Sequence, residues 1–147
     1  MDYPCHVVAA GVFLISPAER VLMVQTFNRL GEGLILPGGM VEADESPAAA
    51  VAREVPEELG IKITVQRLLA VEHRSAQNGR PSSLQFVFAA TESVREDVAL
   101  ALQPDEIAAT HWVQRDQVVE HHGLAGQPRM RAALASLDSG APVYLET

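Results

Sequence analysis

Acidic side chains are concentrated in one short stretch of this chain. Carboxylate oxygens are the ligands that hard cations such as Mg²⁺ and Mn²⁺ prefer, and these cations also bind substrate phosphates. The stretch therefore predicts a divalent-metal site for a phosphorylated ligand, because a cation must stand between the acids and that ligand's negative charge. Six carboxylates lie between residues 42 and 58, with Arg53 as the one basic residue among them: Glu42, Asp44, Glu45, Glu54, Glu57 and Glu58.

A helix is expected to carry the second half of this stretch. Ser46 is a favoured N-cap residue, and Pro47 suits the first helical position, where its missing N–H costs nothing. Gly60 suits the left-handed conformation in which many helices end. We therefore predict a helix that begins at Ser46-Pro47 and ends near Leu59.

Three glutamates share one face of this helix. Glu54, Glu57 and Glu58 stand at positions i, i+3 and i+4, which the helical period places side by side. Like charges at this spacing repel one another, and a cation bound between them removes that cost. A solvated acidic surface is the alternative that the spacing alone leaves open. We expect the core-facing stripe of the same helix to contain Ala48, Val51, Ala52, Val55 and Leu59.

The residues from Gly39 to Ile61 resemble the Nudix box, the motif of the Nudix hydrolase family. The preceding hairpin, the Pro37-Gly38-Gly39 lead-in and Trp112 in a late strand also resemble the family, although the 23-residue box alone is specific. The match to the box favours a metal site over a solvated acidic surface on the helix. The box G-x5-E-x7-R-E-U-x-E-E-x-G-U, with U apolar, is matched at every fixed position by Gly39, five residues, Glu45, seven residues and Arg53-Glu54-Val55-Pro56-Glu57-Glu58-Leu59-Gly60-Ile61.

The resemblance implies a hydrolase that cleaves the diphosphate linkage of a nucleoside diphosphate joined to another group X, by attack of water at phosphorus. It implies that Glu54, Glu57 and Glu58 hold Mg²⁺ or Mn²⁺, that the Gly39 carbonyl is a further ligand, and that Glu54 helps to deprotonate the water. The implied chemistry is consistent, because diphosphate cleavage needs its charge neutralised and a water held in line with phosphorus. The implied partner is a small nucleotide-containing diphosphate, and X is not readable from the sequence.

Other residues are expected to support the reaction. By the resemblance, Arg53 and Glu45 form a pair that orients the ligand carboxylates. The family often adds an acid from a loop outside the box, for which Glu106 is our candidate and Glu92 a weaker one. A solvated loop acid is the alternative for Glu106.

Substrate contacts are expected in two loops. Phe27 and Arg29 precede the Pro37-Gly38-Gly39 turn, where a base can stack or a phosphate can pair with an arginine. Arg74 and Arg80 flank a second loop and can serve in the same way.

Pro56 is the one feature of the box that argues against catalysis. Inside a helix, proline removes a hydrogen bond, here to the Ala52 carbonyl, and costs about 3 kcal/mol. A kink between Glu54 and Glu57 would re-aim the ligands, so a Nudix-fold module that binds or senses a nucleotide without turnover is the alternative function. A prenyl-diphosphate isomerase on the same fold is a third interpretation, but it would need a cysteine in the active site, and Cys5 stands near the terminus.

The elements that must position these residues follow from periodicity and turn signals. Their order, β-β-β-α-β-β-β-α-α without a repeating βαβ unit, predicts an α+β fold with helices on a mixed sheet. The resemblance refines this to an α/β/α sandwich, with residues 1–147 as a single Nudix domain. The breaker residues Pro37-Gly38-Gly39 predict a loop. We expect strands at His6–Ile15, Val21–Thr26, Leu34–Leu36, Ile61–His73, Leu84–Thr91 and Ile107–Val113, and further helices at Arg115–His122 and Pro128–Leu137.

Composition argues against several other functions. The chain has 147 residues, 11 basic and 19 acidic, with a net charge of −8 and no basic cluster of the kind that long nucleic acids require. No apolar run approaches the roughly 18 residues of a membrane span. The single cysteine, Cys5, which we expect in the core of the first strand, and the absence of a signal peptide predict a cytoplasmic location. The histidines lack zinc-ligand spacing, and we expect His121-His122 at an exposed helix end. The sequence does not fix the oligomeric state, although many Nudix relatives form homodimers.

Overall fold

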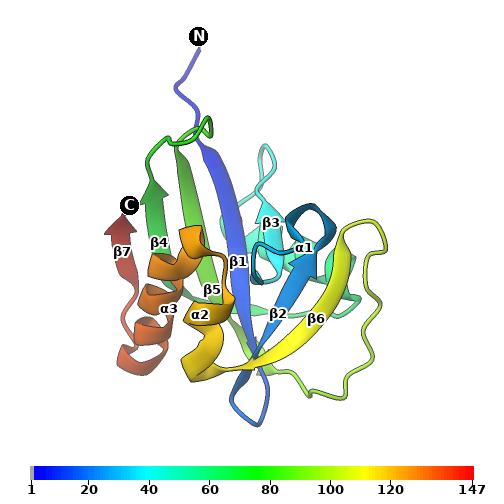
Figure 1. Cartoon of the computed structure of the whole chain (residues 1–147). Coiled ribbons are helices and arrows are strands. Elements are labelled where there is room, and N and C mark those ends of the chain that lie inside the picture. The colour runs from blue at the N-terminus through cyan, green and yellow to red at the C-terminus, as the bar shows by residue number, and fades with distance from the viewer. Residues whose placement is uncertain (1) are drawn as a thin grey trace.

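A computed structural model describes residues 2–147, and its centre is a seven-stranded sheet. The strands lie in the order β6-β2-β1-β5-β4-β7, and the short β3 pairs with β1 off this path (Figure 1). β1 runs parallel to β5 and β4 runs parallel to β7, whereas the other neighbours are antiparallel, so the sheet is mixed. The strands are β1 (Val7–Ile15), β2 (Arg20–Thr26), β3 (Gly38–Met40), β4 (Val65–Arg74), β5 (Ser83–Ser93), β6 (Ile107–Gln114) and β7 (Val143–Glu146).

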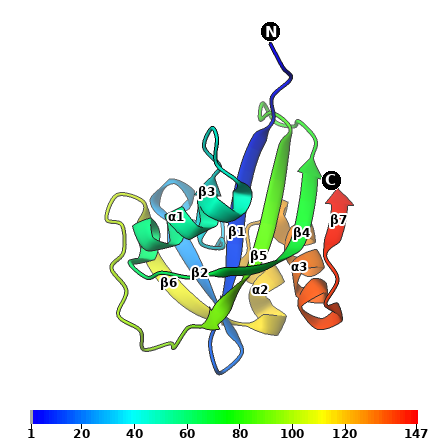
Figure 2. The ribbon, with the colours of Figure 1, turned by 180° about the vertical axis from the view of Figure 1, so that it is seen from behind.

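Helices flank this sheet. α2 and α3 lie in front of the strands in Figure 1, and α1 lies in front when the molecule is turned by 180° (Figure 2). The predicted α+β architecture, a mixed sheet between helices, is confirmed. No helix within residues 2–147 combines the length and the apolar character needed to span a bilayer. The helices are α1 (Pro47–Leu59), α2 (Val118–His121) and α3 (Gln127–Ser139), and the 3-10 turns are η1 (Phe27–Arg29), η2 (Arg115–Gln117) and η3 (Leu124–Gly126).

Alternation along β1 produces two apolar layers. Phe13 belongs to a buried cluster that includes Met130 of α3, whereas its neighbours Val12 and Leu14 belong to a second cluster that includes Val55 of α1. Successive side chains of a strand point to opposite faces. The same strand therefore fixes the acidic helix on one face of the sheet and α3 on the other.

The structure differs from the sequence prediction at two strands. Leu34–Leu36 forms only isolated bridges, and the third strand is β3, Gly38–Met40, which the sequence placed in a loop. Gly38 pairs here because it lacks a side chain: its φ is 146°, and a Cβ would lie 2.0 Å from the Ala10 carbonyl oxygen. β7 was not predicted, because a four-residue strand that follows Gly140 carries little pattern of its own.

Several smaller predictions are wrong. Cys5 is exposed ahead of β1, and its thiol donates to the Tyr3 carbonyl. Ala52 is exposed on α1, and Ala50 is buried in its place. His122 is only 7% exposed, although His121 beside it is exposed as predicted. The strand predicted from residue 61 begins at residue 65, and the helix predicted at 115–122 is divided into η2 and α2.

Candidate active site

The acidic helix α1 is fixed at both of its ends. At the N-terminus, the Ser46 hydroxyl accepts a hydrogen bond from the Ala49 N–H at 3.0 Å. At the C-terminus, Gly60 adopts the predicted left-handed conformation with a φ of 73°. The helix continues through Pro56 without interruption, so the loss of one backbone hydrogen bond does not break it. The glutamates therefore keep the regular helical spacing.

Glu58 is the most buried of these glutamates, with 3% of its surface exposed. Its Oε1 accepts a hydrogen bond of 3.0 Å from the Gly38 N–H, so β3 fixes its orientation. Burial raises the pKa of Glu58 to about 8, the Gly38 hydrogen bond opposes this shift, and the charges of Glu54 and Glu106 add to it. A buried carboxylate beside two other acids is a site where a bound cation gains the most energy.

Glu54 lies against β3 at close range. A Cβ on Gly39 would lie 2.6 Å from Oε1 of Glu54, so a side chain there would displace the carboxylate from its present position. Burial raises the pKa of Glu54, Arg53 opposes this shift, and Glu57 and Glu106 add to it. The backbone of Gly39 and the carboxylate of Glu54 are thus adjacent, as sharing a metal requires.

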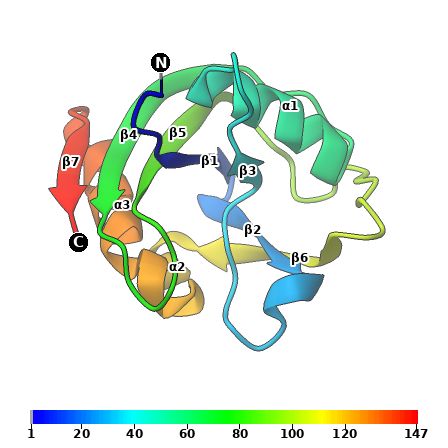
Figure 3. The ribbon, with the colours of Figure 1, turned by 90° about the horizontal axis from the view of Figure 1, so that it is seen from above.

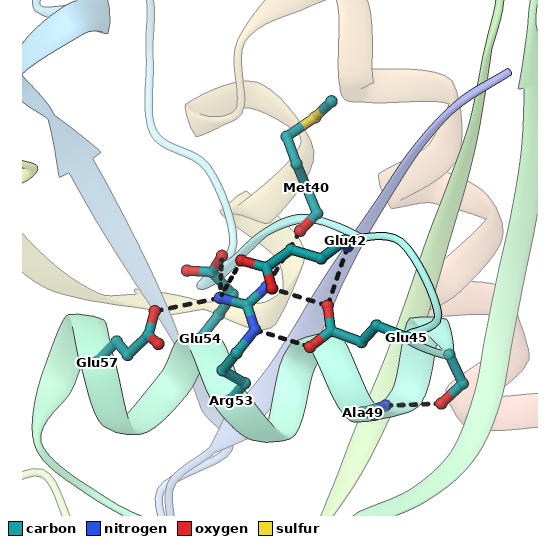
Figure 4. A network of polar contacts seen from close by, with 8 residues as sticks. Met40, Glu42, Glu45, Ala49, Arg53, Glu54 and Glu57 are labelled. Carbon is teal, nitrogen blue, oxygen red and sulfur yellow. Dashed lines mark hydrogen bonds and ion pairs between the residues drawn. The ribbon is translucent and has the colours of Figure 1, made fainter.

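Arg53 joins the carboxylates of the box, as Figure 4 shows. Its Nε and Nη2 donate to the two oxygens of Glu45 at 2.7 and 3.0 Å, and this bidentate pair lowers the pKa of Glu45. Its Nη1 donates to Glu54 at 3.1 Å and to Glu57 at 3.2 Å. Arg53 also donates to the Met40 carbonyl at 3.2 Å, which ties the guanidinium to β3. The predicted contact between Arg53 and Glu45 is therefore present.

The donor set fits a hard divalent cation, although the ligands are not arranged around one point. Within residues 2–147, no three acidic, histidine or cysteine side chains form a ready-made metal cluster. Arg53 is the reason we identify, because it draws Glu54 and Glu57 onto its guanidinium. A set made only of oxygen ligands favours Mg²⁺ or Mn²⁺ over zinc. Glu54, Glu58 and Gly39 line one cavity, whereas Glu57 does not line it and is held by Arg53.

Glu106 lies beside these acids at the end of the β5–β6 connection. This connection is held to α1, because the Gln103 N–H donates to the Glu58 carbonyl at 3.0 Å. It is held to η1, because the Phe27 N–H donates to the Glu106 carbonyl at 3.0 Å. Glu92, the weaker candidate, instead accepts a 2.8 Å hydrogen bond from the Thr64 N–H. Of the two candidate acids, only Glu106 lines the same cavity as Glu54 and Glu58.

One open cavity of about 1370 Å³ is lined both by acids of the site and by three of the predicted substrate contacts. Arg53, Glu57 and Phe27 do not line it, and Phe27 has 50% of its surface exposed. The predicted site residues that line the cavity are Arg29, Gly39, Glu54, Glu58, Arg74, Arg80 and Glu106.

The sequence analysis missed a second charged cluster at this cavity. Glu72 of β4 is completely buried and pairs with Arg129 of α3, which lines the cavity. The Thr147 hydroxyl donates to the other oxygen of Glu72 at 2.8 Å. His122 also lines the cavity, and its Nδ1–H donates to the Gly123 carbonyl at 2.9 Å. The one available signal was Glu72 itself, an acid that directly follows the apolar run 68–71 of β4.

Comparisons with known proteins extend these observations. A family model described as NUDIX domain matches residues 6–135. The 8-oxo-dGDP phosphatase NUDT18 of Danio rerio is 36% identical over 112 residues, which are 76% of this chain but only 32% of that protein. A MutT-like protein of Streptomyces ambofaciens is 29% identical over 95% of this chain and 82% of that protein. The crystal structure of a MutT protein from Methanosarcina mazei Go1 shares the fold, with a TM-score of 0.73, 19% identity and coverage of 95% of this chain and 99% of that one.

Proposed function

The chain belongs to the Nudix family, and on that premise we propose that it is a metal-dependent pyrophosphohydrolase. Its reaction is hydrolysis of the diphosphate linkage in a nucleoside diphosphate joined to a group X. The observation that carries this proposal is the convergence of Glu54, Glu58 and Glu106 on one cavity beside Gly39. Acids that face one cavity repel an anionic substrate unless a cation is bound with it.

Each residue of the box has a role in this proposal. Glu54, Glu57 and Glu58, with the Gly39 carbonyl, would hold Mg²⁺ or Mn²⁺. Such an ion neutralises charge on the diphosphate and lowers the pKa of a bound water. Arg53 fixes the orientation of the carboxylates through the contacts described above.

Glu106 is the proposed general base, and Glu54 is the alternative. A carboxylate in this position takes a proton from the attacking water as the water approaches phosphorus. Glu106 suits this role because it faces the cavity from a separate loop, and because Arg53 contacts Glu54 but forms no ion pair with Glu106 within residues 2–147.

Arg29 and Arg74 are the proposed substrate contacts, because their cations line the same cavity as the acids. Phe27 remains a predicted stacking residue at the exposed edge of η1. The name of the NUDT18 relative adds 8-oxo-dGDP to the substrates worth testing. A cytoplasmic location and a homodimer remain predictions.

A nucleotide-binding module without turnover is the second candidate, and one contact favours it. Arg53 already donates hydrogen bonds to Glu54 and Glu57, so a metal ion must compete with its guanidinium group for these carboxylates. Pro56 favours it less than the sequence suggested, since α1 remains a continuous helix. The isomerase interpretation loses support, because Cys5 is exposed ahead of β1 and does not line the cavity.

A substrate screen tests the proposal. The purified protein is incubated with nucleoside triphosphates, 8-oxo-dGDP, ADP-ribose, NADH, dinucleoside polyphosphates and nucleotide sugars, with Mg²⁺ or Mn²⁺ at roughly 5 mM. Products are separated by chromatography, with EDTA as the control. We expect one substrate class to be cleaved only in the presence of metal. Thermal stabilisation by a nucleotide without any cleavage would instead identify the binding module.

A further inference from the structure

The cavity has two ends of opposite charge. Glu54, Glu58 and Glu106 lie at one end, where the charges of Glu54 and Glu106 raise the pKa of Glu58. Four arginines also line the cavity. Three of them, from three different elements, are what we call the arginine end: Arg29 of η1, Arg74 of β4 and Arg129 of α3; the fourth, Arg80, lies in the β4–β5 connection. Seen from above, α1 and the β4–β5 connection next to Arg74 lie on opposite sides of β1 and β3 (Figure 3).

Arg129 is the fixed member of the arginine end. Its side chain is 13% exposed and contacts Glu72, which is completely buried and also bound by the Thr147 hydroxyl. Burial lowers the pKa of Arg129, the Glu72 carboxylate opposes this, and the cations of Arg74 and Arg29 add to the lowering. The charges of Arg29 and Arg74 thus reach Arg129, and of the three arginines only Arg129 pairs with a carboxylate within residues 2–147.

Arg29 and Arg74 carry the uncompensated charge. Among residues 2–147, neither forms an ion pair with any carboxylate, including Glu32 and Glu120, which also line the cavity. Arg29 is exposed and Arg74 is partly buried, so both guanidinium groups are hydrated and accessible to a ligand, beside the buried Arg129. A bound anion would pair with them through charge-assisted hydrogen bonds.

We propose that Arg29, Arg74 and Arg129 form a second anion subsite, which binds a phosphate group that the substrate carries in addition to its scissile diphosphate. This inference rests on the proposed function, since the diphosphate is placed at the acidic end. The substrate class is thereby narrowed to molecules with phosphate at two separated positions. A substrate with only the scissile diphosphate leaves the arginine end without a counter-ion.

Binding of inorganic tripolyphosphate in EDTA tests the subsite without metal or turnover. Under these conditions the acidic end repels the probe, so isothermal titration calorimetry at low ionic strength reports on the arginine end. We expect Arg29→Gln and Arg74→Gln each to weaken binding roughly tenfold, because each removes one charge-assisted contact. Arg131→Gln is the matched control, since Arg131 lies exposed on α3 and does not line the cavity; its affinity is expected to stay within about twofold of wild type. Arg129 is left intact because its removal would strand buried Glu72.

The results separate this inference from the proposed function. Equal affinity for tripolyphosphate in the wild type and in the three variants, or no binding to the wild type, overturns the subsite, whatever the substrate screen shows. Weakened binding in the Arg29 and Arg74 variants without any hydrolysis supports the subsite and counts against the enzyme. If the screen finds a substrate, both variants should raise KM severalfold with little change in kcat, and Arg131→Gln should change neither.

Discussion

α1 and α3 are helices of equal length whose functional side chains reach the cavity in different ways. Both span 13 residues, contain proline in the first turn and end at a left-handed glycine, Gly60 or Gly140. The acids of α1 have their fixed neighbour, Arg53, on the same helix, whereas Arg129 of α3 depends on Glu72, 57 residues away. A site built within one helix is readable from the sequence, and a site assembled across the fold is not.

The N-termini of the two helices show the same contrast. Ser46 caps α1 with its own hydroxyl. α3 begins at Gly126 without a side-chain cap, because a Cβ there would lie 2.2 Å from the His122 ring and 2.9 Å from Nη2 of Arg129. The start of α3 is thus determined by the packing of the cavity wall, at the expense of a local hydrogen bond.

The largest effect is expected at the carboxylates of α1. Glu58→Gln and Glu57→Gln should each reduce metal-dependent turnover by about a thousandfold, because an amide is a poor ligand for a hard cation. The fold should persist, since a glutamine at position 58 can still accept the Gly38 hydrogen bond. Initial rates and circular dichroism measure both effects, with exposed Asp97→Asn as the control. Full activity in either variant would refute the metal assignment.

At α3, the expected loss is in stability. Arg129→Met leaves Glu72 buried without its cation, which should cost about 3–5 kcal/mol in the free energy of unfolding. The double variant Glu72→Gln/Arg129→Met removes the stranded charge and should recover a large part of this loss. Urea unfolding of the wild type, the single variant and the double variant measures the recovery. A double variant no more stable than Arg129→Met would show that the pair acts through packing and not through charge.

His122 should make the same region sensitive to acid. Burial lowers the pKa of His122 from 6.5 to about 4, so the unfolded chain takes up the proton first as the pH falls. The contribution of neutral His122 to the free energy of unfolding is therefore complete above about pH 6.5. It is lost progressively toward pH 4, by about 3 kcal/mol in total. Urea unfolding between pH 7.5 and 4.5 should show a shallower loss for His122→Gln than for the wild type. The exposed His111→Gln should follow the wild type, and identical slopes in all three proteins would contradict the assignment.

Glu106 tests whether a residue outside α1 shares in the chemistry. Glu106→Gln should lower kcat about a hundredfold, because it removes the proposed base and leaves the α1 ligands in place. Glu92→Gln is the matched control, since Glu92 bonds to the Thr64 N–H and lies outside the cavity. Wild-type rates in Glu106→Gln would move the role of base to Glu54.

The same contrast between local and tertiary contacts separates the features that could be predicted from the sequence from those that could not. The ends of α1, its acidic face and the mixed sheet were predictable, because caps, periodicity and the box are local patterns. β3 was not predictable. Gly38 pairs with β1 because the two backbones approach each other closely, and residue propensities carry no information about such an approach. The burial of His122 and the pairing of Glu72 with Arg129 depend on elements that meet only in the folded chain.

The smallest effect is expected at the cap of α1. Ser46→Ala removes the hydrogen bond to the Ala49 N–H and should cost about 1 kcal/mol in the free energy of unfolding. Turnover at saturating metal should change less than twofold, because Val51, Val55 and Leu59 still fix the helix against the sheet. Ser139→Ala, at the exposed end of α3, is the control and should cost less. A large loss of activity in Ser46→Ala, without a matching loss of stability, would show that the cap positions the carboxylates directly. α1 would then depend on its first turn as closely as α3 depends on the cavity wall.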